Sequence, residues 1–190
     1  MAQTTSKSRI LAFNANSVSG KLNAIKCLAE TYEPDIIAIC ETKIGPNFDD
    51  NELLGNNYTV WRKDRAQGAG GVLIAVNNDS DVKVLSCSEG PGECIALTIQ
   101  IHTRIVINVV NFYRPPSEYM LDNFVEMLDK FGEKANTIFV GDYNFPDLDW
   151  KTDPKKPSVK PNSRRVTMHQ SALDTRSEEH TSELQSHSDL

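Results

Sequence analysis

The stretch Thr137-Ile138-Phe139-Val140-Gly141-Asp142-Tyr143-Asn144 joins a short apolar run to a carboxylate and a carboxamide two residues apart. Two earlier runs end in a similar way, because residues 10–13 lead into Asn14 and residues 35–40 lead into Glu41. Short β-rich runs bounded by turn residues are typical of buried strands. In a layered α/β fold, polar groups at such strand ends gather in one crevice, where ligands bind. We therefore expect these three polar groups to lie close together.

The residue types at these strand ends favour one kind of ligand. Carboxylate and carboxamide oxygens are what Mg²⁺ prefers, usually through one or two carboxylates, with a substrate phosphate completing the shell. The sequence therefore predicts a divalent-metal site for phosphodiester chemistry, with Mg²⁺ as the expected ion and Mn²⁺ as an alternative. Each residue alone also has an ordinary interpretation. Asn14 and Asp142 are common turn residues, and Glu41 could be neutralised by Lys43, since an unpaired charge is costly at the end of a buried run.

Composition suits one soluble domain. A chain of 190 residues can bury a sizeable core without disulfides. Its four cysteines form no Cys-x-x-Cys pair, so we expect reduced thiols and an intracellular protein. The N-terminus lacks a secretory signal, and no apolar run approaches the ~20 residues of a membrane span. The net charge of −6 does not exclude a nucleic-acid substrate, because a metal site needs carboxylates and backbone binding depends on a local basic rim.

Hydrophobic spacing predicts helices at about 20–32 and 121–131. Between residues 58 and 112, five short runs separated by turn residues predict an antiparallel meander, with a hairpin turn at His102-Thr103. The mixture favours helices that cover sheets over a strict βαβ array. The pattern alone therefore gives an α/β or α+β class and no finer choice.

The two ends of the chain carry no such pattern. We expect disorder in residues 1–8, a folded region over 9–150, and a basic, proline-rich loop of the same domain over 151–175. Residues 176–190 resemble the translation of a DNA-sequencing adapter. We treat this last segment as a non-native tail and exclude it from fold reasoning.

Five motifs in order resemble the endonuclease/exonuclease/phosphatase superfamily: Asn14-Ala15-Asn16, Glu41-Thr42-Lys43, Gly70-Gly71-Val72, Tyr113-Arg114-Pro115-Pro116 and Gly141-Asp142-Tyr143-Asn144. Residues 141–150 are most similar to the apurinic-like endonuclease domain of non-LTR retrotransposons. Any single motif could occur by chance, but five in order with strand contexts are specific. The resemblance covers residues 9 to about 175. It implies a DNase I-like two-layer β-sandwich flanked by helices, incomplete in its second half.

The resemblance also implies roles for particular residues. Asn14 and Glu41 match metal ligands of the family, and Tyr113, Asp142 and Asn144 match its catalytic residues. A carboxylate beside the attacking water positions it and accepts its proton, while the metal neutralises charge on the phosphoryl oxygens. A neighbouring carboxamide or phenol supplies an N–H or O–H donor without a second negative charge. Asp142 and Asn144 would point the same way if the strand continued through both.

Three arginines are candidate DNA contacts. Arg62 and Arg65 precede a glycine-rich turn, and Arg114 follows Tyr113, so each could bind backbone phosphate without reading sequence. A solvated surface is an equal alternative for Arg62 and Arg65. The predicted DNA-binding residues are therefore Arg114, Arg62 and Arg65.

One part of the family pattern is missing. The family ends with a Ser-Asp-His motif, whereas Ser188-Asp189-Leu190 lacks the histidine and follows no apolar strand. Since a general acid or base is typically worth about 10²–10⁴-fold in rate, we expect little or no activity from this polypeptide.

The leading hypothesis from sequence is Mg²⁺-dependent nicking of DNA. In an intact element, such a nick would prime a reverse transcriptase domain that follows, in the nucleus; no membrane partner is expected. Two alternatives remain open. One is another superfamily phosphodiesterase, acting in DNA repair or on lipids, and the other is a non-catalytic remnant that binds metal or nucleic acid weakly.

Overall fold

The computed structural model describes residues 7–65, 68–102, 104–116, 121–134, 136–145, 148–149 and 158–159. The chain divides into two compact units, residues 1–144 and 145–190, and each is described by itself. Most of the segments expected to be disordered, loop-like or non-native (1–8, 151–175 and 176–190) lie outside the described residues.

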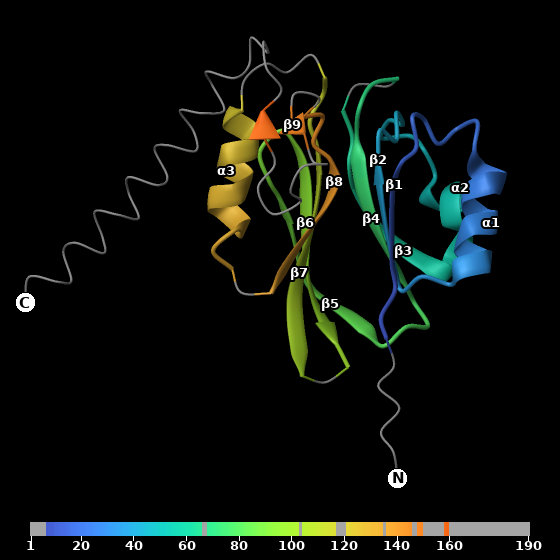
Figure 1. The fold of residues 1–190 in the computed structure, drawn as a ribbon. Coiled ribbons are helices and arrows are strands. Elements are labelled where there is room, and N and C mark those ends of the chain that lie inside the picture. Colours follow the sequence, from blue (N-terminus) through green and yellow to red (C-terminus); the bar gives the residue numbers. More distant parts are fainter. Residues whose placement is uncertain are drawn as a thin grey trace, which may run out of the picture. The chain divides into compact units, whose positions relative to one another are not determined.

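The first sheet of the N-terminal unit has four strands in the order β1-β2-β4-β3. Their bounds are Ile10–Asn14, Ile36–Cys40, Val72–Asn77 and Tyr58–Lys63 in that order. β1 runs parallel to β2, whereas β4 is antiparallel to both of its neighbours. Helix α1 (Leu22–Tyr32) connects β1 to β2, and the short helices α2 (Asp50–Leu54) and η1 (Gly55–Asn57) precede β3. Figure 1 shows α1 and α2 on the outer side of this sheet.

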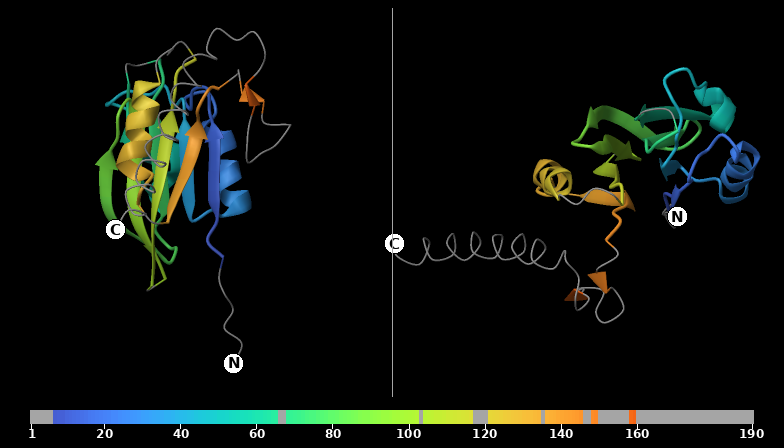
Figure 2. Two further views of the ribbon diagram at one scale, coloured as in Figure 1. Left: turned by 60° about the vertical axis from the view of Figure 1, so that its left-hand side comes forward. Right: turned by 90° about the horizontal axis from the view of Figure 1, so that it is seen from above.

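The second sheet follows chain order, β5-β6-β7-β8. Its strands are Val82–Glu89, Glu93–Ile101, Ile105–Tyr113 and Thr137–Asp142. The first three are antiparallel, and β8 lies parallel to β7 after the crossover through α3 (Asp122–Phe131). Met127 and Phe131 of α3 pack on Phe112 of β7. The views in Figure 2 place α3 on the outer side of this sheet, opposite to α1.

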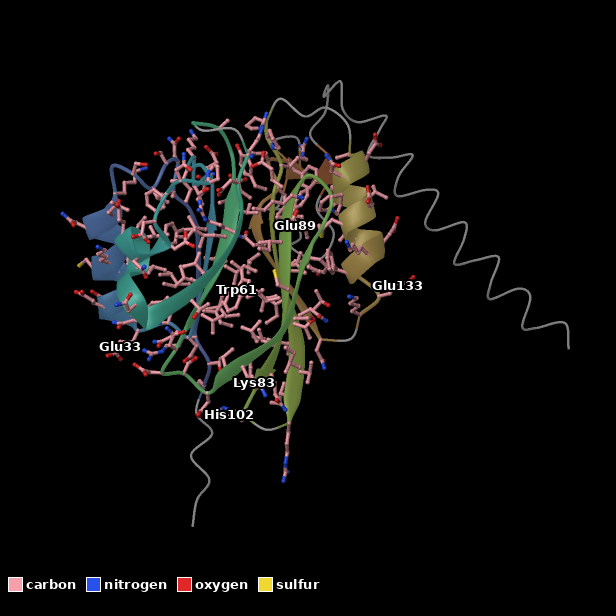
Figure 3. The ribbon with its side chains drawn as sticks, turned by 180° about the vertical axis from the view of Figure 1, so that it is seen from behind. Glu33, Trp61, Lys83, Glu89, His102 and Glu133 are labelled. Carbon is pink, nitrogen blue, oxygen red and sulfur yellow. The ribbon has the colours of Figure 1, made fainter. Side chains whose placement is uncertain are left out.

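The inner faces of the two sheets pack against each other. All five residues of β2 are buried, because alternate side chains face α1 and the second sheet. Ile36 and Ile74 of the first sheet belong to one apolar cluster with Leu97 and Val109 of the second. Trp61 of β3 packs against this cluster and lies between the sheets in Figure 3. The sandwich therefore places the ends of β1, β2 and β8 near one another.

The predicted fold class, two mixed sheets with flanking helices, is confirmed. The predicted meander over 58–112 is wrong as a single sheet, because β3 and β4 join the first sheet and β5, β6 and β7 form the second. Local apolar spacing indicates a strand but does not determine which sheet it joins. The hairpin between β6 and β7 is confirmed, with Ile101 opposite Ile105; Thr103 of its turn lies outside the described residues.

The described part of the C-terminal unit is small. Leu148–Asp149 (β9) pairs antiparallel with Ser158–Val159 (β10). We predicted only loop for residues 151–175, so this short ladder is a correction. None of the helices in the described ranges is long and apolar enough to cross a membrane.

Candidate functional site

The structure brings together the three polar strand ends. Asn14 is the last residue of β1, Glu41 follows β2, and Asp142 is the last residue of β8. The Asn14 Nδ2 atom lies 2.8 Å from Glu41 Oε1 and 2.8 Å from Asp142 Oδ2. Two carboxylates from different sheets therefore converge on one point.

Asn14 turns its nitrogen toward these carboxylates. Its Oδ1 accepts a hydrogen bond of 2.9 Å from the backbone N–H of Asn16. The oxygen-ligand role of Asn14 stays a prediction, and in this arrangement its amide nitrogen is the atom that contacts both carboxylates. The physical reason is that two nearby carboxylates repel each other unless a positive or hydrogen-donating group lies between them. The Asn14 amide nitrogen carries the positive end of the amide dipole and supplies the hydrogen-donating group between the two carboxylates. A cation would be favourable at the same point, because both carboxylates face it.

Glu41 is held as an ionised carboxylate. Burial pushes its pKa upward, but hydrogen bonds from Asn14, Lys43 and Tyr113 and the charge of Lys43 outweigh burial and lower the pKa below its ordinary value. The Lys43 Nζ atom lies 3.1 Å from Glu41 Oε2. Lys43, the alternative partner expected from sequence, thus neutralises the charge of Glu41. The other carboxylate oxygen of Glu41, Oε1, still faces Asn14.

The segment after β2 has a fixed and unusual backbone. Glu41 has a φ of 51° and Lys43 a φ of 53°, in the left-handed region. The Glu41 carbonyl accepts a hydrogen bond of 2.8 Å from Ser17 N, and Lys43 N donates to Gly70 O at 2.8 Å. Non-glycine residues keep such conformations where their surroundings over-determine them, often at functional sites. This segment therefore orients Glu41 before any ligand arrives.

Tyr113 lies at the end of β7, beside Asp142 in the β7–β8 register. Burial, followed by its hydrogen bond to Glu41 and the nearby negative charges, raises the pKa of Tyr113 well above its ordinary value. Its hydroxyl therefore stays protonated and serves as an O–H donor beside the two carboxylates.

Asn144 does not extend the strand. β8 ends at Asp142, and Asn144 has a φ of 47°. The condition for Asn144 and Asp142 to point the same way, a strand that continues through both, is therefore not met. Asn144 N donates to Asp142 Oδ1 at 3.2 Å, and Asn144 Nδ2 donates to the Arg114 carbonyl at 2.7 Å. Its amide nitrogen thus holds the local chain.

Two of the three arginines predicted to contact DNA are engaged inside the fold. Arg114 is only 1% exposed, which is incompatible with a surface contact to DNA. Arg62 lies 2.9 Å from Asp50 and 2.7 Å from Asp64. It also donates to the carbonyls of Gly45, Pro46 and Phe48. Sequence could not distinguish these arginines from surface ones, because burial depends on distant segments. Arg65 is half exposed and pairs with Glu93 at 3.0 Å, so its DNA contact stays a prediction.

Asn111 is a residue of this region that the sequence did not reveal. It is fully buried in β7 and donates across the sandwich to Ile39 O at 3.0 Å and Leu73 O at 2.8 Å. The Cys40 thiol donates to Asn111 Oδ1 at 3.1 Å, and burial raises the pKa of that thiol to about 12. An asparagine inside a β-rich run carries no signal of this role. It fixes the two sheets that bear Glu41 and Asp142.

The donor set fits a hard divalent cation. In the described ranges, no group of three or more His, Cys, Asp or Glu side chains is arranged to hold a metal. Mg²⁺, however, usually binds one or two carboxylates and keeps several waters. Glu41 offers one carboxylate ligand, the Asp142 carboxylate adds negative charge beside it, and the Asn14 amide marks the favourable position between them.

Comparison with known proteins gives a consistent assignment. The model of the Endonuclease/Exonuclease/phosphatase family matches residues 11–177, whereas no curated protein matches the chain. An AP endonuclease from Archaeoglobus fulgidus is similar in structure, with a TM-score of 0.57 at 22% identity, covering 71% of this chain and 56% of that one.

Two other solved structures are similar. A 3′ phosphatase from Neisseria, bound to a product DNA hairpin, has a TM-score of 0.61 at 19% identity, over 78% of this chain and 63% of that one. The endonuclease domain of TRAS1, a telomere-specific non-LTR retrotransposon, has a TM-score of 0.51 at 17% identity, over 73% of this chain and 59% of that one. The chain thus spans less than two thirds of each. The family match over most of the sequence, with the sandwich that carries it, shows that this chain belongs to the endonuclease/exonuclease/phosphatase family.

Proposed function

We propose that this chain carries a Mg²⁺ site for hydrolysis of DNA phosphodiesters, in an endonuclease domain of the non-LTR retrotransposon type. The observation that supports it most is the convergence of the Glu41 and Asp142 carboxylates on the Asn14 amide nitrogen. The similarity of residues 141–150 to the endonuclease domain of non-LTR retrotransposons supports that branch, and the TRAS1 domain is among the similar structures, together with AP endonucleases. A reverse transcriptase domain and a nuclear address in the intact element are part of the same proposal.

Glu41 would hold the cation, with Mn²⁺ able to replace Mg²⁺. The bound ion would neutralise charge on phosphoryl oxygens and on the departing oxygen. Glu41 is suited to this task because Lys43 and Tyr113 keep it ionised, and because a left-handed backbone fixes its direction.

Asp142 would orient the attacking water and accept its proton. Its Oδ1 is held by Asn144 N, and its Oδ2 faces Asn14. Tyr113 stays protonated, and its O–H, which donates to Glu41 in this arrangement, would turn to a phosphate oxygen when substrate binds. Asn144 supports this arrangement because its left-handed backbone conformation turns the chain directly after β8.

Divalent-cation binding tests the proposal without requiring turnover. Mn²⁺ binding to the full chain can be measured by electron paramagnetic resonance for the wild type and for Glu41→Gln and Asp142→Asn. Each substitution removes a charge but keeps the shape, so we expect Mn²⁺ affinity to fall by about tenfold or more. Glu30→Gln, on the exposed side of α1, is the matched control and should leave affinity unchanged. Equal affinity in all four proteins would refute the metal site.

The substrate class needs a separate experiment. Plasmid nicking, cleavage of an abasic duplex and hydrolysis of phosphoinositide vesicles can be compared with Mg²⁺ present. We expect weak or no turnover from this polypeptide, because the family's closing Ser-Asp-His motif does not occur in its 190 residues. Strong nicking that Asp142→Asn abolishes would contradict that low-activity expectation while supporting the site. Preference for the lipid would overturn the assignment to DNA.

A further inference from the structure

Arg114 is a buried cation directly behind the proposed site. It follows the last residue of β7 and is 1% exposed. Its Nε donates to the Tyr143 carbonyl at 2.9 Å, and its terminal Nη2 donates to the Asn144 carbonyl. A guanidinium carries five N–H donors in a rigid planar fork. It can therefore hold two successive carbonyls of a turn at once.

The turn returns these contacts to Arg114. Asn144 Nδ2 donates to the Arg114 carbonyl at 2.7 Å, and Arg114 N donates to the Asp142 carbonyl at 2.9 Å. The main chain and side chain of Arg114 are thus both bonded to the segment from Asp142 to Asn144. This reciprocity accounts for the left-handed φ of 47° at Asn144, since strained backbone persists only where its surroundings fix it.

The direction of this turn sets the orientation of the Asp142 carboxylate. Asn144 N holds Asp142 Oδ1 at 3.2 Å, so Oδ2 is left to face Asn14 Nδ2 at 2.8 Å. A continuous series of hydrogen bonds therefore runs from the Arg114 guanidinium through the Asn144 backbone to Asp142. Rotation of the turn would move Oδ2 away from the point shared with Glu41.

We propose that Arg114 is a positioning residue, whose guanidinium locks the 142–144 turn and thereby aims the Asp142 carboxylate at the cation position. This role requires no contact of Arg114 with DNA or metal. It rests on the proposed function only in its last step, in which the orientation of the Asp142 carboxylate affects the affinity for the cation. The direction of the carboxylate can be measured by itself.

Arg114→Lys is the informative substitution, because lysine keeps the positive charge and most of the length but loses the planar fork. Arg114→Met also removes the charge. Ile25→Ala is a control for general destabilisation, because it creates a cavity between α1 and the outer face of the first sheet, away from Arg114. All measurements are made at a temperature at which each variant is folded by circular dichroism.

Two readouts separate the steps. The first is the pair of side-chain amide proton resonances of Asn14, which report its hydrogen bonds to Glu41 and Asp142. We expect these resonances to move in Arg114→Lys and to stay in place in Ile25→Ala. The second is Mn²⁺ affinity, which we expect to fall at least tenfold in Arg114→Lys and to remain within twofold of wild type in the control.

The outcomes are distinguishable. Shifted Asn14 resonances in a protein that never binds Mn²⁺ would support the positioning role and refute the metal site. Unchanged resonances and affinity in Arg114→Lys would overturn the positioning role and leave the metal site standing. If neither Arg114 variant folds, hydrogen exchange in the wild-type protein tests the proposal instead. We expect the Nε–H of Arg114 to exchange with solvent far more slowly than the Nε–H of the exposed Arg104. Equal exchange rates would overturn the proposal.

Discussion

Glu41 adopts a backbone conformation that few side chains accept. A φ of 51° costs a non-glycine residue about 1–2 kcal/mol, and glycine would remove that cost. The glutamate is nevertheless tied at both ends, by Ser17 at its carbonyl and by Asn14, Lys43 and Tyr113 at its carboxylate. The carboxylate, rather than local backbone preference, therefore explains the residue at this position.

The lowered pKa of Glu41 has a consequence for acid stability. Because its folded pKa lies below the ordinary value of 4.5, unfolding favours proton uptake. The ionised carboxylate therefore stabilises the fold above the unfolded pKa, and this stabilisation is lost as the pH falls through the folded pKa. We expect the free energy of unfolding of Glu41→Gln to lie below that of wild type at about pH 6, and the gap to close toward about pH 3. Urea denaturation across this range measures it.

Glu30→Gln serves as the control for this titration. Its side chain is exposed on α1, so its difference from wild type should stay near zero at every pH. A gap between wild type and Glu41→Gln that is independent of pH would show that Glu41 is not stabilised in its ionised form.

The pairing of β7 with β8 depends on a glycine. Gly141 lies opposite Phe112 in this parallel pair and has a φ of 131°. A Cβ added there would meet the Phe112 carbonyl oxygen at 2.0 Å. The close approach of the two backbones at this point sets the position of Asp142, which is the next residue.

Gly141→Ala should therefore destabilise the protein and displace the end of β8. We expect a loss of about 2–4 kcal/mol in the free energy of unfolding, because a backbone clash is added to a disfavoured φ. Gly20→Ala is the matched control, since nothing lies within 4 Å of its added Cβ, and it should change stability by less than about 0.5 kcal/mol. Guanidinium chloride denaturation compares the two. Similar small effects would disprove the close approach.

The candidate site requires the two sheets of the sandwich to keep a fixed position relative to each other. Apolar packing between them is not directional, whereas the hydrogen bonds of Asn111 to Ile39 O and Leu73 O are. These bonds join β7 to both β2 and β4. They therefore fix the sheet that carries Asp142 against the one that carries Glu41.

Asn111→Ala should reduce both stability and cation affinity. Two buried carbonyls lose a donor, which costs about 1–3 kcal/mol for each group left unsatisfied, and the sheets lose a fixed relative position. Asn108→Ala is the control on the same strand, because the bonds of Asn108 to Thr98 and Thr137 stay within the second sheet. We expect urea denaturation to show a larger loss for Asn111→Ala. Mn²⁺ affinity should fall only in that variant, and equal falls in both would contradict the role of Asn111.

Local pattern predicted much of this structure. The helix expected at 20–32 is α1 at Leu22–Tyr32, and the run ending in Asp142 is β8, because apolar spacing and turn residues act over a few positions. Short α2 was not predicted; Asp49 caps it by accepting from Asn51 N at 3.0 Å, and five residues give too little periodicity to detect.

The sequence by itself determined strands β1 to β8, the two long helices and the residue types at the strand ends, since these follow from neighbours along the chain. Only the tertiary structure decided that β3 and β4 leave the meander for the first sheet. It also decided that Asn14 turns its nitrogen inward and that Arg114 is buried. These features depend on contacts between residues as far apart as Asn14 and Asp142. Such contacts form when the sheets pack, and the spacing of residues along the chain does not specify them.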